Sequence, residues 1–98
     1  MGELRFEWDP RKAAANLRRH GVSFTEAETA FTDEQGLLID DPAHSAAEDR
    51  FILLGMSAAM RLLVVVHCYR ADDRVIRLIS ARKAERQERR QYEERWKR

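Results

Sequence analysis

The sequence predicts an α+β fold of one domain, residues 1–98, in which a small antiparallel sheet carries helices packed on one face. Three observations predict it. Residues 4–8 alternate apolar and charged side chains, as a half-buried strand does. Asp9-Pro10 and Gly21 have the residue types that begin and end a helix. Beyond residue 36, short apolar runs alternate with turn residues, which favours consecutive antiparallel strands.

The next elements follow from local signals. Ser23 and Glu26 have the spacing of a capping box, which predicts a second short helix over residues 24–31. Residues 37–39 are predicted to form a short strand, because they are apolar and end at an Asp-Asp-Pro turn. Residues 50–56 are predicted to form the next strand.

A hairpin and a final helix complete the predicted order β-α-α-β-β-β-β-α. Residues 62–69 and 75–79 are rich in β-branched side chains and flank the turn residues 71–73. Ser80 is then a possible N-cap, and the chain is helix-forming from Ala81 almost to its end. We expect this arrangement to gather five cations in one anion-binding region: Arg61, Arg70, Arg77, Arg82 and Lys83.

Composition limits the function classes. No apolar run approaches the ~20 residues of a membrane span, and the charged start is unlike a signal peptide, so we expect a cytoplasmic protein. The single cysteine, Cys68, lies in an apolar run, where a buried inert thiol is expected. Residues 70–98 carry 11 Lys or Arg and 6 Asp or Glu, although the whole chain has a net charge of +1. Such a basic end suits a nucleic acid, or an acidic protein segment.

Motifs for cofactors and metals are missing from the sequence. There is no phosphate-binding glycine loop and no G-x-S-x-G elbow, and His20, His44 and His67 lack metal-ligand spacing. We therefore expect no cofactor and no metal. The arginines, carboxylates and tyrosine that remain suit metal-independent RNA cleavage, in which the 2′-hydroxyl of the substrate attacks the phosphate.

Roles follow from the chemistry of each side chain. Glu48 is predicted as the base, Arg61 and Arg77 as phosphate clamps, and Tyr92 as the acid or a stacking platform. Further contacts to RNA are expected from five basic residues, Arg50, Arg70, Arg82, Lys83 and Lys12. Alternatively, Arg77 pairs with Glu48 or a helix carboxylate, and the basic last helix is a solvated face.

Four separated stretches resemble the BrnT family of toxins from bacterial type II toxin–antitoxin systems. They read FEWDPRKAAANLRRHGVSFTEAETAF, DDPAHSAAEDRFILLGMS, RLLVVVHCYR and IRLISARKAERQERRQYE, and they span residues 6–93. The resemblance implies a RelE-like fold with two N-terminal helices and a C-terminal helix. It also implies a ribonuclease that arrests growth, neutralised by a BrnA-type antitoxin through which the complex binds operator DNA. The family's functional positions correspond here to Glu48, Arg50, Arg61, Arg77 and Arg82, followed by Tyr92.

Two other functions stay open on the sequence alone. One is a binding module, such as a degenerate toxin, that holds RNA or a partner without catalysis. The other is a DNA-binding regulator acting alone, which the lack of a strong basic recognition face on the first two helices disfavours.

Overall fold

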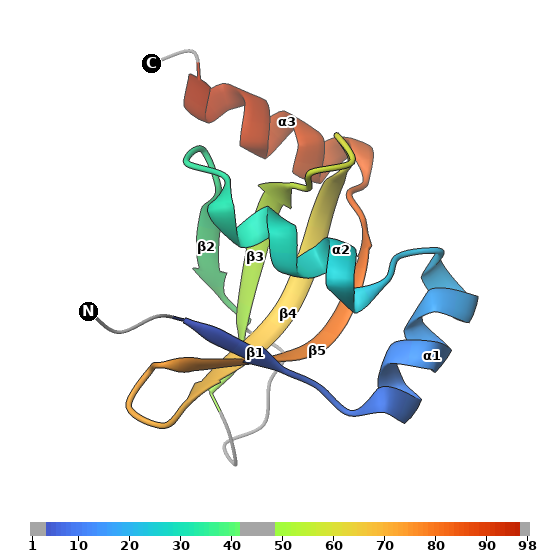
Figure 1. Cartoon of the computed structure of the whole chain (residues 1–98). Helices are drawn as coiled ribbons and strands as arrows, with labels where there is room; N and C mark the ends of the chain where they lie inside the picture. The colour runs from blue at the N-terminus through green and yellow to red at the C-terminus, as the bar shows by residue number, and fades with distance from the viewer. Residues whose placement is uncertain (1–3, 42–48, 97–98) are drawn as a thin grey trace.

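The computed structural model describes residues 4–41 and 49–96 of the chain. Its elements are β1 (Arg5–Glu7), α1 (Pro10–His20), α2 (Phe24–Thr29), the 3₁₀ turn η1 (Ala30–Thr32), β2 (Leu37–Asp40), β3 (Phe51–Met56), β4 (Leu62–Arg70), β5 (Val75–Lys83) and α3 (Arg86–Trp96). The described strands form one sheet in the order β1-β5-β4-β3-β2 (Figure 1). The predicted α+β class is confirmed. None of the described helices is long and apolar enough to cross a membrane.

The sheet is mixed, so the expectation of a wholly antiparallel sheet is wrong at one edge. The strands β2 to β5 form the expected antiparallel meander. In contrast, β1 pairs with β5 in parallel, and Glu7 lies opposite Arg77. Parallel neighbours need a long connection, and here the connection from β1 to β5 is most of the chain. β2 and β5 are the two edge strands of the meander, and β1 adds to the β5 edge.

The start and end of α1 follow the sequence prediction. The Asp9 side chain accepts a hydrogen bond from the backbone N–H of Arg11 at 2.8 Å, and Pro10 occupies the first turn. Gly21 ends the helix at a φ of 70°, a left-handed conformation that glycine adopts without steric cost. The predicted helix is therefore confirmed at both ends.

The second helix keeps one half of its predicted capping box. The Ser23 hydroxyl accepts the backbone N–H of Glu26 at 3.0 Å, but the Glu26 carboxylate does not turn back to the cap. It accepts hydrogen bonds from Ser57 and Arg61 on the β3–β4 turn instead. After Thr29 the chain tightens into η1, so the predicted single helix is a helix followed by a 3₁₀ turn.

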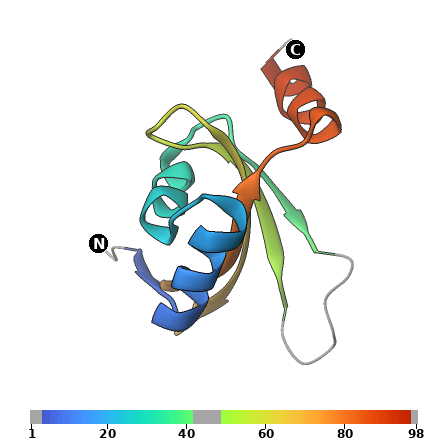
Figure 2. The same ribbon diagram turned by 90° about the vertical axis from the view of Figure 1, so that its right-hand side faces the viewer.

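Helices cover both faces of the sheet, which corrects the expectation that all would pack on one face. Figure 2 shows α1 and α2 on one side and α3 on the other. Successive side chains of β3 and β4 point to opposite faces of the sheet, and both sets of side chains are apolar. Each face therefore needs a helix to cover it. One buried set, Leu53, Leu63 and Val65, packs under α2. The other set consists of Leu54, Leu62 and Val64, and it packs with Tyr92 of α3.

The predicted helix start at Ala81 is wrong, because β5 continues to Lys83 and α3 begins at Arg86. Residues 80–83 pair with residues 63–66 of β4, and this pairing overrides their local helix preference. The start of α3 is capped instead by the side chain of Glu88, which lies three residues after Glu85. The backbone N–H of Glu85 donates to the Glu88 carboxylate at 2.8 Å, as a glutamate at the third helical position does in a capping box.

A buried asparagine joins α1 to the sheet. The Asn16 side-chain amide donates to the carbonyl oxygens of Ala81 at 2.8 Å and of Val22 at 2.9 Å, and its oxygen accepts the Ala81 N–H at 3.0 Å. β1 pairs only with residues 75–77 of β5, so Asn16 takes the place of a neighbouring strand at Ala81. The amide thereby satisfies backbone groups that the interior would otherwise leave without a partner.

We predict that Asn16→Ala destabilises the protein by on the order of 2–3 kcal/mol, because Ala81 and Val22 lose buried hydrogen-bond partners. Urea unfolding of the variant measures this loss, and amide exchange at Ala81 locates it. Alanine is the better helix former, so helix propensity alone predicts the opposite sign. An unchanged or raised midpoint would show that the amide does not hold α1 to β5.

Candidate functional site

The predicted anion-binding residues lie at two ends of the sheet rather than in one region. Arg61 precedes β4, and Lys83 ends β5 opposite Leu63, at the α3 end. Arg77 lies opposite Cys68, which is seven residues along β4 from Arg61, or roughly 20 Å of extended chain. Arg61 and Arg77 therefore do not form one phosphate clamp.

At the α3 end, Arg61 is held by the Glu26 carboxylate. Its Nε donates to Glu26 Oε2 at 2.9 Å, and its Nη2 contacts both Glu26 Oε1 and, at 3.0 Å, the carbonyl oxygen of Gly21. The Ser57 hydroxyl donates to the same carboxylate at 2.7 Å. The hydrogen bonds from Arg61 lower the pKa of Glu26 and keep it ionised. This fork ties the start of α2 to the β3–β4 turn, a structural role.

Tyr92 is likewise held in the structure. Its ring is 2% exposed, and its hydroxyl donates to Asp33 Oδ2 at 2.5 Å. The backbone N–H groups of Met56 and Gln35 also donate to Asp33, at 2.8 and 2.9 Å. Burial raises the pKa of Asp33, but these three hydrogen bonds outweigh it and lower the pKa. Burial and the hydrogen bond to Asp33 raise the pKa of Tyr92 to about 12, so the phenol keeps its proton at neutral pH.

Two further predicted contacts to RNA lie beside α3, and another lies on α1. Arg82 forms a bidentate pair with Glu88, Nη1 to Oε1 at 2.9 Å and Nη2 to Oε2 at 2.7 Å. Its guanidinium is therefore occupied by a carboxylate. Lys83 and Lys12 are exposed. Lys12 lies on the first turn of α1, away from α3.

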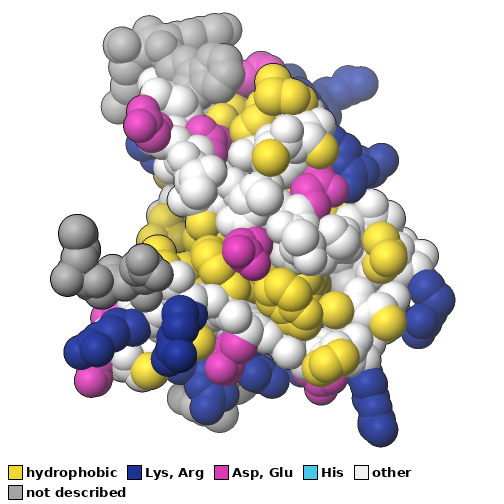
Figure 3. Space-filling model, in the orientation of Figure 1, with side chains coloured by type: hydrophobic (Ala, Val, Ile, Leu, Met, Phe, Trp, Pro, Cys, Tyr) yellow, Lys and Arg dark blue, Asp and Glu magenta, His cyan; other side chains and the backbone are white. Residues whose placement is uncertain are grey.

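At the opposite end of the sheet, a carboxylate lies between two arginines. Glu7 Oε2 is 3.0 Å from Arg77 Nη1 and 3.6 Å from Arg70 Nε. The side chains of Arg77, Glu7 and Arg70 are 32%, 41% and 58% exposed. Figure 3 shows Lys and Arg side chains gathered at its lower left, near β1 and the β4–β5 turn. Arg50 precedes β3 at this end. One carboxylate cannot neutralise two guanidinium groups, so the cluster keeps a positive charge.

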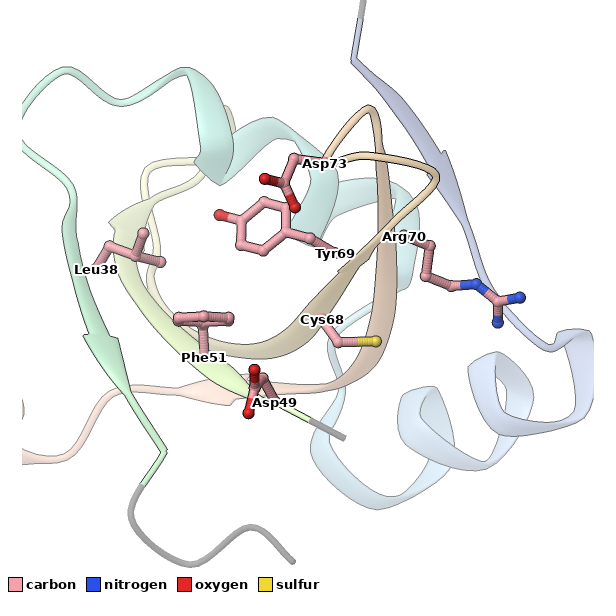
Figure 4. Close-up of a pocket in the computed structure, with 7 residues that line it drawn as sticks. All are labelled: Leu38, Asp49, Phe51, Cys68, Tyr69, Arg70 and Asp73. Atoms are coloured by element: carbon pink, nitrogen blue, oxygen red, sulfur yellow. The ribbon is translucent and has the colours of Figure 1, made fainter. Parts of the chain in front are cut away.

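An open cavity of about 570 Å³ adjoins this cluster (Figure 4). Leu38, Phe51 and Tyr69 line it, together with Asp73 at its rim, while the Arg70 side chain points away from them towards β1. The rings of Phe51 and Tyr69 are 5.3 Å apart and meet edge to face. Burial, together with the nearby charge of Asp73, raises the pKa of Tyr69. Such aromatic surfaces receive nucleobases by stacking.

The sequence analysis did not identify Glu7 as a site residue and predicted Glu48 as the base. Glu48 lies outside the described residues, as does His44. Glu7 was visible only as a polar position of an alternating strand, and its meeting with Arg77 depends on the parallel register of β1, which no local signal gives. Cys68 is buried, as predicted. In the parts of the chain that the structure describes, no three His, Cys, Asp or Glu side chains group as metal ligands do.

Comparison with known proteins agrees with this architecture. A family model described as "Ribonuclease toxin, BrnT, of type II toxin-antitoxin system" matches residues 8–88. The crystal structure of the Brucella abortus ribonuclease toxin BrnT superposes with a TM-score of 0.61 at 20% identity, covering 85% of this chain and 99% of that chain. At this identity the superposition establishes a shared fold. A search of curated proteins gave no match.

We predict that Tyr92 stabilises the fold in a pH-dependent way. Its pKa is about 12 in the folded chain, against 10.0 ordinarily, so its contribution is complete below pH 10 and is lost as the pH rises from 10 towards 12. Tyr92→Phe should therefore be less stable than wild type by about 1–3 kcal/mol at pH 8, and the difference should shrink by pH 11.5. Urea unfolding of both proteins at the two pH values measures it, and a constant difference would contradict it.

Proposed function

This chain belongs to the BrnT family of ribonuclease toxins, and we propose that it arrests growth by cleaving RNA without a metal ion. A toxin of a type II system has an antitoxin partner, and we propose that this partner is of the BrnA type. The RelE-like arrangement expected from the sequence stays part of this proposal. The observation that carries the site assignment is the carboxylate of Glu7 lying between Arg77 and Arg70 on the side of the sheet away from α1 and α2.

The proposed reaction is an internal transesterification. The 2′-hydroxyl oxygen attacks the neighbouring phosphorus while a base takes its proton, and the bond to the 5′-oxygen breaks as that oxygen gains a proton. The products are a 2′,3′-cyclic phosphate and a free 5′-hydroxyl. The guanidinium groups of Arg77 and Arg70 stabilise the charge that builds on the phosphate oxygens. Both are partly exposed, so a substrate phosphate reaches them.

Two carboxylates are candidates for the base. Glu7 contacts both arginines, so it lies next to a phosphate bound by them. Glu48 is the base that the sequence predicted, and it precedes Arg50 by two residues. Substituting each one alone distinguishes them.

In this proposal, the cavity beside the cluster holds a nucleobase of the substrate. Phe51, Tyr69 and Arg70 border the same cavity, and the Arg70 side chain extends from its edge away from the two rings. In this proposal the phosphate lies on Arg70 and the adjoining nucleoside turns into the cavity. Stacking on these rings orients the sugar without selecting one base.

Arg61, Arg82 and Tyr92 support this centre indirectly. Each makes close contacts with a carboxylate of its own, namely Glu26, Glu88 and Asp33. These contacts favour a role in fixing the β3–β4 turn and α3. Arg77 and Arg70 share a single carboxylate instead, which favours them as the phosphate-binding pair.

We predict that purified protein cleaves naked RNA in excess EDTA and leaves 2′,3′-cyclic phosphate ends. Arg77→Ala should lower the rate by about a hundredfold or more, since a preorganised charge on the phosphate is lost. Arg74→Ala is the matched control, because Arg74 is an exposed arginine of the adjoining β4–β5 turn whose hydrogen bonds, with Ala71 and Arg5, are made by its backbone. End sequencing and single-turnover rates measure both. The activity of Glu7→Gln and Glu48→Gln identifies the base.

Other outcomes separate the alternatives. Cleavage seen only with translating ribosomes would add the ribosome as a partner and keep the chemistry. Growth arrest that survives Arg77→Ala together with both glutamine substitutions would overturn the assigned centre. No cleavage under either condition, with RNA still bound, would favour the non-catalytic binding module.

A further inference from the structure

A groove of about 320 Å³ runs between α1 and β5, separate from the cavity beside the proposed cleavage centre. Its polar side chains are Lys12, Asn16, Arg19 and His20 of α1 and Ser80 of β5. Among the described residues that line it, none is Asp or Glu. The groove therefore presents positive charge and hydrogen-bond donors with no compensating carboxylate.

One face of α1 forms the wall of the groove. Lys12, Ala15, Asn16 and Arg19 are spaced by three, four and seven residues, so they share this face. Asn16 is engaged with β5, and Lys12 and Arg19 lie on either side of it, about 10 Å apart along the helix axis. Ala15 leaves the space between the two cations open.

An irregularity in β5 forms the floor. Val66 pairs with Ser80 but His67 pairs with Leu78, so Ile79 is the extra residue of a β-bulge. Successive side chains of a regular strand point to opposite faces, and the bulge breaks that alternation. Both Ile79 and Ser80 consequently border the groove.

Helix stability does not account for all of these cations. Arg18, Arg19 and His20 lie in the last turn of α1, where positive charge complements the helix dipole. Lys12 lies in the first turn, where the dipole disfavours a cation, and that turn has no acidic residue. Within residues 4–41 and 49–96, Lys12 and Arg19 form no ion pair. Their charges remain available to a ligand.

We propose that the α1–β5 groove binds phosphates of an RNA strand whose neighbouring phosphate lies at Arg77, an inference that rests on the proposed function. β1 stops opposite Arg77, and the groove begins two residues further along β5, at roughly 7 Å. Lys12 and Arg19 neutralise two phosphates, and His20 and Ser80 donate hydrogen bonds to their oxygens. Bound nucleotides here extend the substrate beyond the cleaved bond.

The test measures binding of a fluorescein-labelled 2′-O-methyl RNA twelve-mer, which lacks the attacking hydroxyl and so cannot be cut. Anisotropy titrations at several salt concentrations compare Lys12→Ala/Arg19→Ala with Arg11→Ala/Arg18→Ala. The control pair has the same helix, spacing and charge change, and neither residue lines the groove. The groove pair should weaken binding and lower the slope of log affinity against log salt by about 1.4, whereas the control pair should change it less.

A second pair of variants adds charge without removing a cation. Ala15→Glu places a carboxylate in the groove, and Ala14→Glu places one on the neighbouring exposed face of α1. Only Ala15→Glu should weaken RNA binding strongly. Equal losses from both members of either comparison, or no loss from any variant, would overturn the groove as a site.

Further outcomes identify the ligand and keep the two proposals apart. A labelled oligoglutamate peptide that binds the groove more tightly than the RNA would overturn the RNA assignment in favour of an acidic protein segment. Because the anisotropy assay needs no cleavage, intact groove-dependent binding by a chain that cuts no RNA would refute the proposed reaction alone. Loss of groove dependence in a chain that still cuts RNA would refute the groove alone.

Discussion

The paired hydrogen bonds between Asn16 and Ala81 are the constraint on which the rest of the arrangement depends. β5 is nine residues long, but β1 covers only its first three, so its outer side at Ala81 has no strand partner. The Asn16 amide supplies the missing donor and acceptor from α1. That fixes α1 against the sheet edge at one height, and it places the basic face of the helix beside the β5 bulge.

The two faces of the sheet then take different tasks. The face under α1 and α2 holds the larger core, and Gly55 lets η1 approach β3 closely, since a Cβ there would lie 2.9 Å from the Ala30 carbonyl oxygen. The opposite face is covered by α3 through Tyr92, which the Asp33 carboxylate holds by its hydroxyl. α3 lies at the end of the sheet near the β3–β4 turn (Figure 2), and among the described residues the side chains of Arg70 and Arg77 at the other end are partly exposed.

Sequence patterns predicted the elements whose signals are local. Asp9, Gly21 and Ser23 act through residues at most four positions away, and the structure has each of these caps. The extension of β5 past Ile79 could not be seen, because pairing with β4 and the grip of Asn16 override the helix signals of Ser80 and its neighbours. The ion-pair partners of the arginines were also hidden, since Glu7 and Arg77 are 70 residues apart in sequence.

The way carboxylates are distributed among the cations accounts for where a polyanion can bind. At the α3 end, Arg61 and Arg82 each have a carboxylate fork of their own, so this end is locally neutralised and rigid. At the β1 end, two arginines share Glu7, and such exposed pairs contribute little to stability. α1 contains no Asp or Glu at all. The unbalanced positive charge therefore follows the edge formed by β1, β5 and α1, and the proposed centre and the proposed groove both lie along that edge.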